Sequence, residues 1–385
     1  MLVNKFYCNF AENPCSRTIK RDILSISLFI MEVSCMYRIN SFREKGIKAA
    51  LFSSEINMHY LSGYTGEGCL LVLPESQHII TDFRYIEQAE RQSPECIVEK
   101  TGKDASRSQI IKTLLDKNDI HELAVETSVL TVDEYRAQEK ALEGVCLVSV
   151  PRVVEEMREV KSDDEIACIR KAGEISCKAF DDLLTYIKPG MTEKEVCAYL
   201  EYRMRVHGSE GIAFDTIVAS GVNGSLPHAV PSDKVIEKGE LVTFDFGAKI
   251  GGYCSDMTRT IAIGEISDEL HKIYDAVLEA QLKALSYIGP GKSCFEADKV
   301  ARDLLEEKYP GAFGHSLGHG VGLFIHESPN LSFRSDRTLM KGHVVTVEPG
   351  VYIPGVGGCR IEDTVIITDD GFINTITTPK QLIVV

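Results

Sequence analysis

The sequence predicts an α/β domain followed by an α+β domain that is built from two similar halves. Three observations lead to this expectation. The chain has 385 residues, a length that suits two domains of ordinary size. Short apolar runs alternate with helical stretches over residues 46–150, as in an α/β unit with a largely parallel sheet. Beyond that point, a nine-residue segment recurs 101 residues later in the chain.

The expected organisation is an extension, 1–35, that is poorly ordered, then a first domain, 36–155, and a second domain, 161–385. The extension contains an apolar stretch at residues 23–31, which is too short to cross a bilayer. Glu32 follows it where a signal peptide would have small residues at a cleavage site. Pro151 and the charged residues after it separate the two domains.

Composition excludes several classes of partner. The 57 acidic residues outnumber the 42 basic ones, for a net charge of −15. Nucleic acids and anionic membranes bind clustered Lys and Arg, so neither is expected as a partner. The 12 cysteines include no C-x-x-C pair and no regular spacing, which favours reduced thiols and a cytoplasmic protein.

Within the first domain, the periodicity of apolar residues predicts the individual elements. Strands are expected at residues 49–53, 69–73, 78–81, 122–125 and 146–150. Helices are expected at residues 85–91, 106–116 and 132–142, each with a polar face.

The second domain contains the internal repeat. The segment Ile187-Lys-Pro-Gly-Met-Thr-Glu-Lys-Glu recurs as Ile288-Gly-Pro-Gly-Lys-Ser-Cys-Phe-Glu. In both copies Pro-Gly ends one helix, and a capping box opens the next helix at Thr192 and at Ser293. The repeat continues 103 residues apart into two strand segments, Leu-Val-Thr-Phe-Asp and Val-Val-Thr-Val-Glu. Each half is therefore expected to contain two helices and then strands, with the halves related by a pseudo-two-fold axis.

The repeat places four carboxylates at equivalent positions, Asp245 with Glu348 and Asp256 with Glu362. A single carboxylate in a hairpin is more often a solvated surface charge. Within each half, however, the two acidic residues flank a Gly-rich turn, so we expect them to face each other across a hairpin. Four such groups brought together carry −4, and like charges this close take up protons unless cations intervene. Two divalent cations would neutralise them.

Histidines follow in a Gly-rich segment, Gly314-His-Ser-Leu-Gly-His-Gly-Val-Gly-Leu-Phe-Ile-His. An isolated histidine is usually a core residue, but three of them beside two acidic hairpins favour a metal centre. One imidazole among carboxylates shifts the preference from Mg²⁺ or Ca²⁺ towards Mn²⁺, Co²⁺, Fe²⁺ or Zn²⁺.

These motifs resemble the M24 metallopeptidases, specifically the branch of Xaa-Pro aminopeptidases and Xaa-Pro dipeptidases (prolidases). The resemblance covers residues 40–385, and it includes Asn57-Met-His-Tyr-Leu-Ser-Gly-Tyr-Thr-Gly and Thr81-Asp-Phe-Arg-Tyr in the first domain. It implies a creatinase-like N-terminal domain, a pita-bread catalytic domain and a homodimer. The metal ligands that it implies are Asp245, Asp256, His319, Glu348 and Glu362. Of these, Asp256 and Glu362 would bridge two metal ions, with Mn²⁺ expected and Co²⁺ or Zn²⁺ as alternatives.

The resemblance also implies the catalytic side chains. His228, His315 and His326 would bind the substrate and transfer protons. Arg360 would lie behind the metal ligands, on the side where the substrate binds. Glu348 would also act as the base for the attacking water. The expected reaction is hydrolysis of the bond before proline in a peptide.

Four functions remain open at this point. We favour an Xaa-Pro aminopeptidase, because the catalytic motifs contain no second arginine for the carboxylate of a dipeptide's proline. The first alternative is an Xaa-Pro dipeptidase, since Arg334, Arg337 or a partner's arginine could supply that contact. A non-peptide amide hydrolase and a non-enzymatic binding protein are the others.

Overall fold

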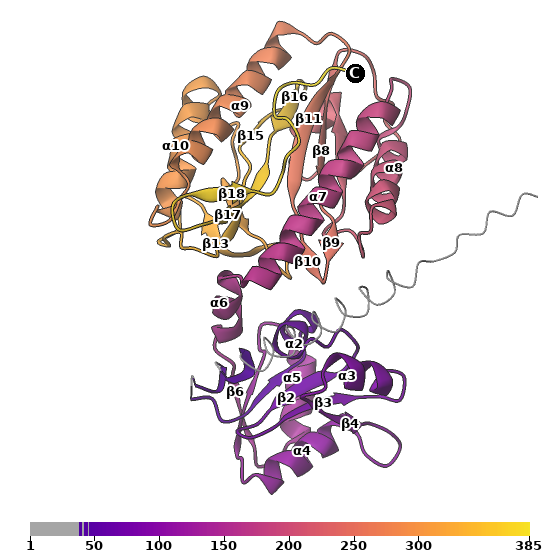
Figure 1. Ribbon diagram of the computed structural model, residues 1–385, viewed down its shortest axis with the longest axis vertical. Coiled ribbons are helices and arrows are strands. Elements are labelled where there is room, and N and C mark those ends of the chain that lie inside the picture. Colours follow the sequence, from indigo (N-terminus) through magenta and orange to yellow (C-terminus); the bar gives the residue numbers. More distant parts are fainter. Residues whose placement is uncertain (1–37, 41, 45) are drawn as a thin grey trace, which may run out of the picture. The chain divides into compact units, whose positions relative to one another are not determined.

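The computed structural model describes residues 38–40, 42–44 and 46–385, and the predicted extension 1–35 lies outside them. The chain divides into two compact units between Val154 and Glu155, within helix α6 (Val153–Glu159). Figure 1 labels many of the elements of both units. Among the described residues, no helix is both long and apolar enough to cross a membrane.

The first unit is an α/β unit with one six-stranded sheet. Its strands are β1 (Ala50–Phe52), β2 (Cys69–Val72), β3 (Gln77–Thr81), β4 (Ile97–Lys100), β5 (Glu122–Val125) and β6 (Cys146–Ser149). Its helices are α2 (Glu55–Ser62), α3 (Ile86–Gln92), α4 (Arg107–Lys117) and α5 (Val132–Ala141). The five predicted strands and three predicted helices are confirmed to within two residues.

The sheet is mixed, whereas a largely parallel sheet was predicted. In the order β4-β3-β2-β1-β5-β6, three neighbouring pairs are parallel, but β2 runs antiparallel to both β1 and β3. For the β2–β3 pair the physical reason is the short connection between the strands, which can join only antiparallel strands. Helix α2 and strand β4 were not predicted.

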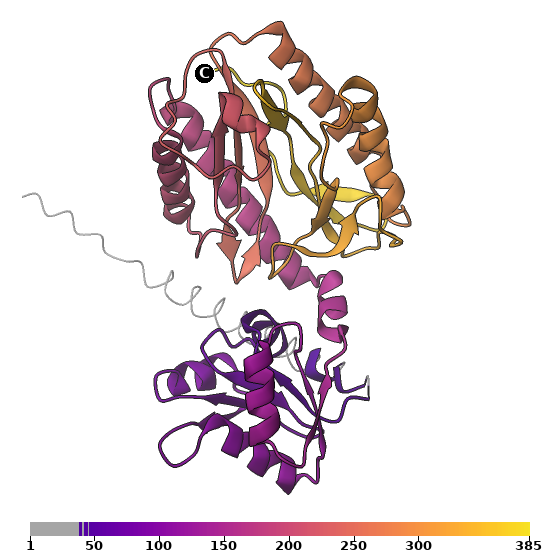
Figure 2. The ribbon, with the colours of Figure 1, turned by 180° about the vertical axis from the view of Figure 1, so that it is seen from behind.

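The second unit repeats one order of elements. The first half contains α7 (Asp163–Tyr186), α8 (Glu193–Val206), β7 (Ile217–Ser220), the 3₁₀ helix η1 (Gly221–Ser225), β8 (Glu240–Phe246), β9 (Lys249–Ile250), β10 (Tyr253–Cys254) and β11 (Met257–Ile263). The second half contains α9 (Asp268–Tyr287), α10 (Cys294–Lys308), β12 (Gly318–Gly320), β13 (Glu327–Leu331), β14 (Val344–Val347), β15 (Gly350–Ile353), β16 (Gly357–Arg360), β17 (Asp363–Ile367) and β18 (Phe372–Asn374). Seen from both sides, the strands lie between the two helix pairs (Figure 2).

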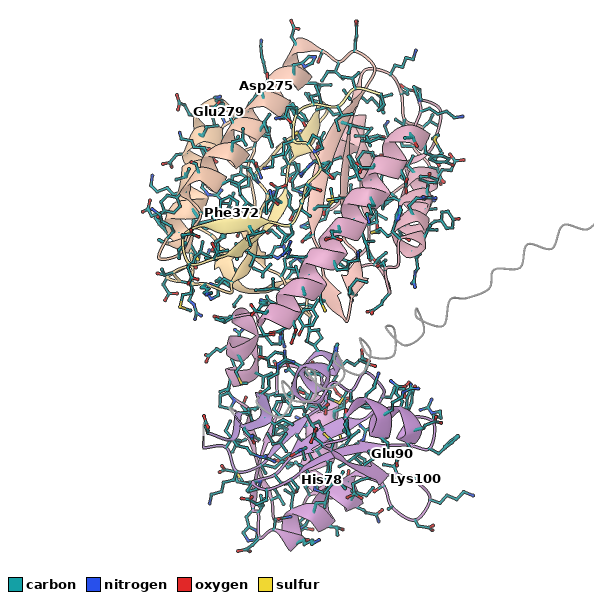
Figure 3. The ribbon with its side chains drawn as sticks, in the orientation of Figure 1. His78, Glu90, Lys100, Asp275, Glu279 and Phe372 are labelled. Atoms are coloured by element: carbon teal, nitrogen blue, oxygen red, sulfur yellow. The ribbon has the colours of Figure 1, made fainter. Side chains whose placement is uncertain are left out.

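Each helix pair packs on the strands of its own half. Helix α9 buries Ile273, Tyr274 and Val277 against the core, while Asp275 and Glu279 are exposed and point away from it (Figure 3). This division between faces follows the 3.6-residue period of the helix. The apolar faces of the helices thereby hold the strands in place.

Caps and turns predicted from the repeat recur in the structure. The capping box predicted at Thr192 is confirmed, with Glu195 as its partner. At Ser293 the structure has half of the predicted box, since Ser293 accepts a hydrogen bond from the Glu296 N–H at 3.4 Å without the reciprocal bond. The turn between β9 and β10 is Gly251-Gly252, with φ of +57° and +77°. Positive φ at both central residues is the geometry that glycine allows in a two-residue hairpin.

Candidate metal centre

Three carboxylates meet where the strands of the two halves converge. Asp245 lies in β8, Asp256 directly precedes β11, and Glu362 directly precedes β17. Each offers one oxygen atom, and these three atoms lie within 4.8 Å of one another. Asp256 and Glu362 are buried, at 4% and 1% exposure.

His319 and Glu348 complete the group. His319 Nε2 lies 3.6 Å from Asp256 Oδ2 and 3.3 Å from Glu348 Oε1. The Nδ1 atom of His319 is 3.0 Å from the Gly320 carbonyl oxygen, so Nδ1 carries the proton and donates it there. Nε2 is thereby left with a free lone pair directed at the carboxylates, as a metal ligand requires.

The register of the first hairpin differs from the expectation. Asp245 is paired with Thr258, two residues beyond Asp256, so the two aspartates do not face each other directly. The reason is the extra β9–β10 hairpin, which occupies residues 249–254 and leaves Asp256 in the short segment before β11. In the second half, Glu348 and Glu362 lie at breaks between strands, after β14 and before β17.

Threonines link the two halves at the centre, a role that was not predicted. Thr258 Oγ1 donates to Glu362 Oε2 at 2.6 Å, and Thr364 Oγ1 donates to the Asp256 carbonyl oxygen at 2.8 Å. Thr258 and Thr364 occupy equivalent positions of the repeat. Each half therefore fixes an acidic residue of the other half.

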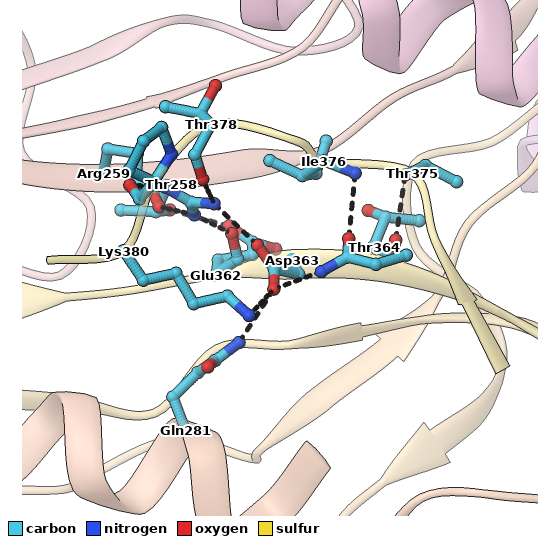
Figure 4. Close-up of polar contacts among 12 residues, drawn as sticks. Thr258, Arg259, Gln281, Glu362, Asp363, Thr364, Thr375, Ile376, Thr378 and Lys380 are labelled. Atoms are coloured by element: carbon cyan, nitrogen blue, oxygen red, sulfur yellow. Dashed lines mark hydrogen bonds and ion pairs between the residues drawn. The ribbon is translucent and has the colours of Figure 1, made fainter. Parts of the chain in front are cut away.

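A second buried network holds the strand that follows Glu362 (Figure 4). Asp363 is fully buried and accepts hydrogen bonds from Arg259 at 2.7 Å and Asn374 at 2.6 Å. Lys380 Nζ lies 2.6 Å from the same carboxylate. Arg259 also donates to the Glu362 carbonyl oxygen at 2.5 Å, so this network sets the backbone position of Glu362.

The electrostatics of the group fit bound cations. Burial, and then the charge of Glu362, raises the pKa of Asp256 well above its ordinary value. Burial also raises the pKa of Glu348 to about 8. Asp245 Oδ1 and Glu362 Oε1 are buried and have no hydrogen-bond partner among the described residues. Oxygen atoms that are buried, crowded and unpartnered are suited to holding divalent cations.

The catalytic histidines predicted from the sequence lie around this group. The rings of His326 and His319 are 4.5 Å apart between centroids. His228 is exposed in the loop after η1, and the carbonyl oxygen of the preceding Pro227 accepts a hydrogen bond from Arg360 at 3.3 Å. Burial lowers the pKa of His315 to about 4, and burial also lowers the pKa of His326. Both rings are therefore neutral near pH 7.

Tyr352 is a further residue of the centre that the sequence did not reveal. Arg360 donates to Asp245 Oδ2 at 2.6 Å and to the Tyr352 hydroxyl at 2.8 Å. His315 Nδ1 donates to the Ser316 carbonyl, so its Nε2 accepts from the same hydroxyl at 2.9 Å. Tyr352 thus connects Arg360 with His315, and no motif or repeat position marked it beforehand.

Metal-free protein should lose stability as pH rises above 6.5. A carboxyl whose folded pKa is raised binds more protons in the folded than in the unfolded state, so its contribution to stability is lost as pH rises through the folded pKa. For Glu348 this window runs from its ordinary value of 4.5 to about 8. Buried His315 and His343, with pKa values lowered to about 4, act in the opposite direction only below 6.5.

Thermal unfolding at pH 6.5 and pH 8, with chelator or with Mn²⁺, measures this effect. We expect the melting temperature of the chelated protein to fall across this interval and the gain on adding metal to be larger at pH 8. A chelated protein that becomes more stable between these pH values would contradict the charge assignment.

Comparison with known proteins adds independent findings. Residues 167–369 match the model of metallopeptidase family M24, and residues 39–160 match that of the creatinase/prolidase N-terminal domain. A protein of Pyrococcus horikoshii described as Xaa-Pro dipeptidase is 39% identical over 90% of this chain and 97% of its own length. These matches confirm the resemblance and the expected fold class.

Two solved structures agree with this. The Xaa-Pro dipeptidase from Bacillus anthracis has a TM-score of 0.87 and 43% identity, and the match covers 91% of this chain and 100% of that one. The X-Pro aminopeptidase from Thermotoga maritima has a TM-score of 0.83 and 40% identity, with 88% and 98% of the two chains covered.

Proposed function

Because the chain belongs to metallopeptidase family M24, we propose that it hydrolyses dipeptides of the type Xaa-Pro. The observation that carries the proposal is the complete group of four carboxylates and one histidine in a chain of this family. Relatives at 39% and 43% identity are named Xaa-Pro dipeptidases. They support the dipeptidase over the aminopeptidase that the sequence alone favoured.

We propose that the centre holds two divalent metal ions, Mn²⁺ by preference and Co²⁺ or Zn²⁺ otherwise. The residues that would hold them are Asp245, Asp256, His319, Glu348 and Glu362. Bound cations of this kind lower the pKa of water and polarise a carbonyl group. One imidazole nitrogen among several carboxylate oxygens suits ions of intermediate hardness.

The protein's own groups would supply proton transfer and orientation. Glu348, to which Thr346 donates a hydrogen bond at 3.0 Å, is placed to take a proton from the attacking water. His228 and His326 would donate hydrogen bonds to the developing oxyanion, and they would relay to the proline nitrogen, as the C–N bond breaks, the proton that Glu348 takes from water. Arg360, anchored on Asp245 and Tyr352, would orient His315 through that tyrosine.

The second candidate is an Xaa-Pro aminopeptidase, which the 40% identity to the structure from Thermotoga maritima favours. The two activities differ in how the site treats the proline carboxylate. A dipeptidase binds this carboxylate with a cationic side chain such as arginine, whereas an aminopeptidase leaves room there for a longer peptide.

We expect kcat/KM for Ala-Pro to exceed that for Ala-Pro-Ala by about 10- to 100-fold, because a hydrogen bond to a charged group contributes about 1.5–3 kcal/mol. Both peptides are assayed at one Mn²⁺ concentration, with Ala-Ala as the control that lacks proline. Preference for the tripeptide would establish the aminopeptidase instead. Cleavage of neither peptide would favour a non-peptide amide as substrate.

We also propose that the protein is a cytoplasmic homodimer. The nine described cysteines are free thiols, which suits a reducing compartment. Sedimentation of the metal-loaded protein tests the dimer.

A further inference from the structure

One buried carboxylate outside the metal centre holds both ends of the loop that carries His228. Glu193, the first residue of α8, has no exposed surface. Its Oε1 accepts hydrogen bonds from the Ser220 N–H at 2.7 Å and the Ser220 hydroxyl at 2.8 Å. Its Oε2 accepts from the Ser232 N–H at 3.1 Å and the Ser232 hydroxyl at 2.7 Å. Asn223 Nδ2 donates to both oxygens, at 3.1 and 3.2 Å.

These contacts close a loop of irregular chain on a single side chain. Ser220 ends β7, Asn223 lies in η1, and Ser232 follows the exposed segment around His228. The N-terminus of α8 adds a second tie, since the Lys194 N–H donates to the Ser232 carbonyl oxygen at 3.2 Å. The ends of the loop are thus fixed by α8, while its middle extends to the metal centre.

The middle of the loop is held at a few points, among them Ala229, which is 6% exposed and packs with Ile217 and Ala219. Leu226 and Val230, on either side of His228, are 56% and 81% exposed. Arg360 donates to the Pro227 carbonyl oxygen at a long 3.3 Å, and Gly224 packs directly on the backbone of Gly358. A histidine in such a loop depends on the anchoring of the loop ends for its position.

The internal repeat separates this role from helix capping. Thr192 and Glu195, which form the capping box, have Ser293 and Glu296 as their equivalents in the second half. The equivalent of Glu193 is Cys294, which is also buried but carries no such charge. The carboxylate is therefore not needed to begin the helix.

We propose that Glu193 is a positioning residue that holds His228 at the metal centre through the loop 220–232. The proposal rests on the peptidase function proposed above, in which His228 contacts the substrate. A misplacement of about 1 Å in a catalytic group can lower the rate about 100-fold, so the anchoring has a measurable effect.

Glu193→Gln tests the proposal, because the amide nitrogen cannot accept the hydrogen bonds of one serine. In the Mn²⁺-loaded protein we expect kcat for Ala-Pro to fall about 10- to 100-fold with metal content unchanged. Hydrogen exchange of residues 221–232 should become faster. Ser232→Ala, which removes one hydroxyl donor, should shift both measurements in the same direction by less, and it serves if Glu193→Gln does not fold.

A matched control comes from the first unit. Glu126 is 2% exposed and accepts hydrogen bonds from the Ser53 and Ser54 N–H groups and from Asn57. Glu126→Gln therefore removes a buried anchor of the same chemistry. We expect it to lower the melting temperature without accelerating exchange at residues 221–232 or lowering kcat.

A double-mutant cycle separates positioning from general destabilisation. If Glu193 acts through His228, Glu193→Gln should reduce kcat no further in a His228→Ala background. Multiplicative losses, an unchanged kcat in His228→Ala, or unchanged loop exchange in Glu193→Gln would each overturn the proposal. A wild-type protein inactive on Xaa-Pro peptides would refute the proposed function instead, and faster exchange confined to the loop would still support Glu193 as its anchor.

Discussion

Asp256→Asn is expected to lose bound metal and peptidase activity together, with kcat/KM lowered by more than about 1,000-fold. Asp256 is central to the group, since its carboxylate lies among those of Asp245 and Glu362 and 3.6 Å from His319 Nε2. Asparagine has nearly the same shape, but it removes one negative charge and replaces one ligand oxygen with an NH₂ group. The affinity of the carboxylate group for divalent cations should therefore fall.

Elemental analysis and kcat/KM for Ala-Pro, measured on the same preparation, check this expectation. Chelation should abolish wild-type activity, and Mn²⁺ or Co²⁺ should restore it. Asp275→Asn, on the exposed face of α9, is the matched control and should keep both metal and activity. An Asp256→Asn protein with two metals and normal turnover would show that Asp256 is not a ligand.

The same substitution should stabilise the metal-free protein against thermal unfolding. Removing one charge from a group whose members raise each other's pKa lowers the electrostatic repulsion in the folded state. Chelated Asp256→Asn should therefore melt at a higher temperature than chelated wild type at pH 8. This sign distinguishes a cation site from an ordinary structural carboxylate.

The repeat made much of the second unit predictable. Segments 101–103 residues apart in sequence placed Asp245 and Glu348 at equivalent positions, and the structure brings the carboxylates together. The hairpin at Gly251-Gly252 was also predictable, because glycine is what such a turn requires. A single sequence therefore predicts turns that require glycine and positions related by an internal repeat.

Other features depend on tertiary contacts and leave no periodic pattern. Helix α2 buries Asn57, Tyr60 and Ser62 along with its apolar residues, so it has no clear polar face. Strand β4 lies at a sheet edge and ends in Glu99-Lys100, so it lacks the apolar run that marks a strand in the sequence. The two-residue offset between Asp256 and the partner of Asp245 arises from strand pairing. The hydrogen bonds that Tyr352 makes with His315 and Arg360 form only in the folded chain, so no sequence pattern predicts them.

His326→Ala is expected to keep its metal but to lose about 10²- to 10⁴-fold in kcat, the range for removal of one positioned acid, base or oxyanion donor. The His326 ring lies 4.5 Å from the His319 ring, and His326 is not among the five residues proposed as metal ligands. Removing it should therefore affect proton transfer rather than metal affinity. His228→Ala, in the loop 220–232, is expected to lose kcat by a factor in the same range.

Metal content and kcat on Ala-Pro distinguish the alternatives for each histidine. His271→Ala, on the exposed surface of α9, is the matched control and should change neither quantity. Loss of metal in His326→Ala would make that residue a ligand instead. An unchanged kcat would assign it a packing role, since its edge-on contact with Phe324 at 6.2 Å between ring centroids would then account for its place in the fold. Retained metal with a large loss of kcat is the one outcome that requires His326 to act on the substrate.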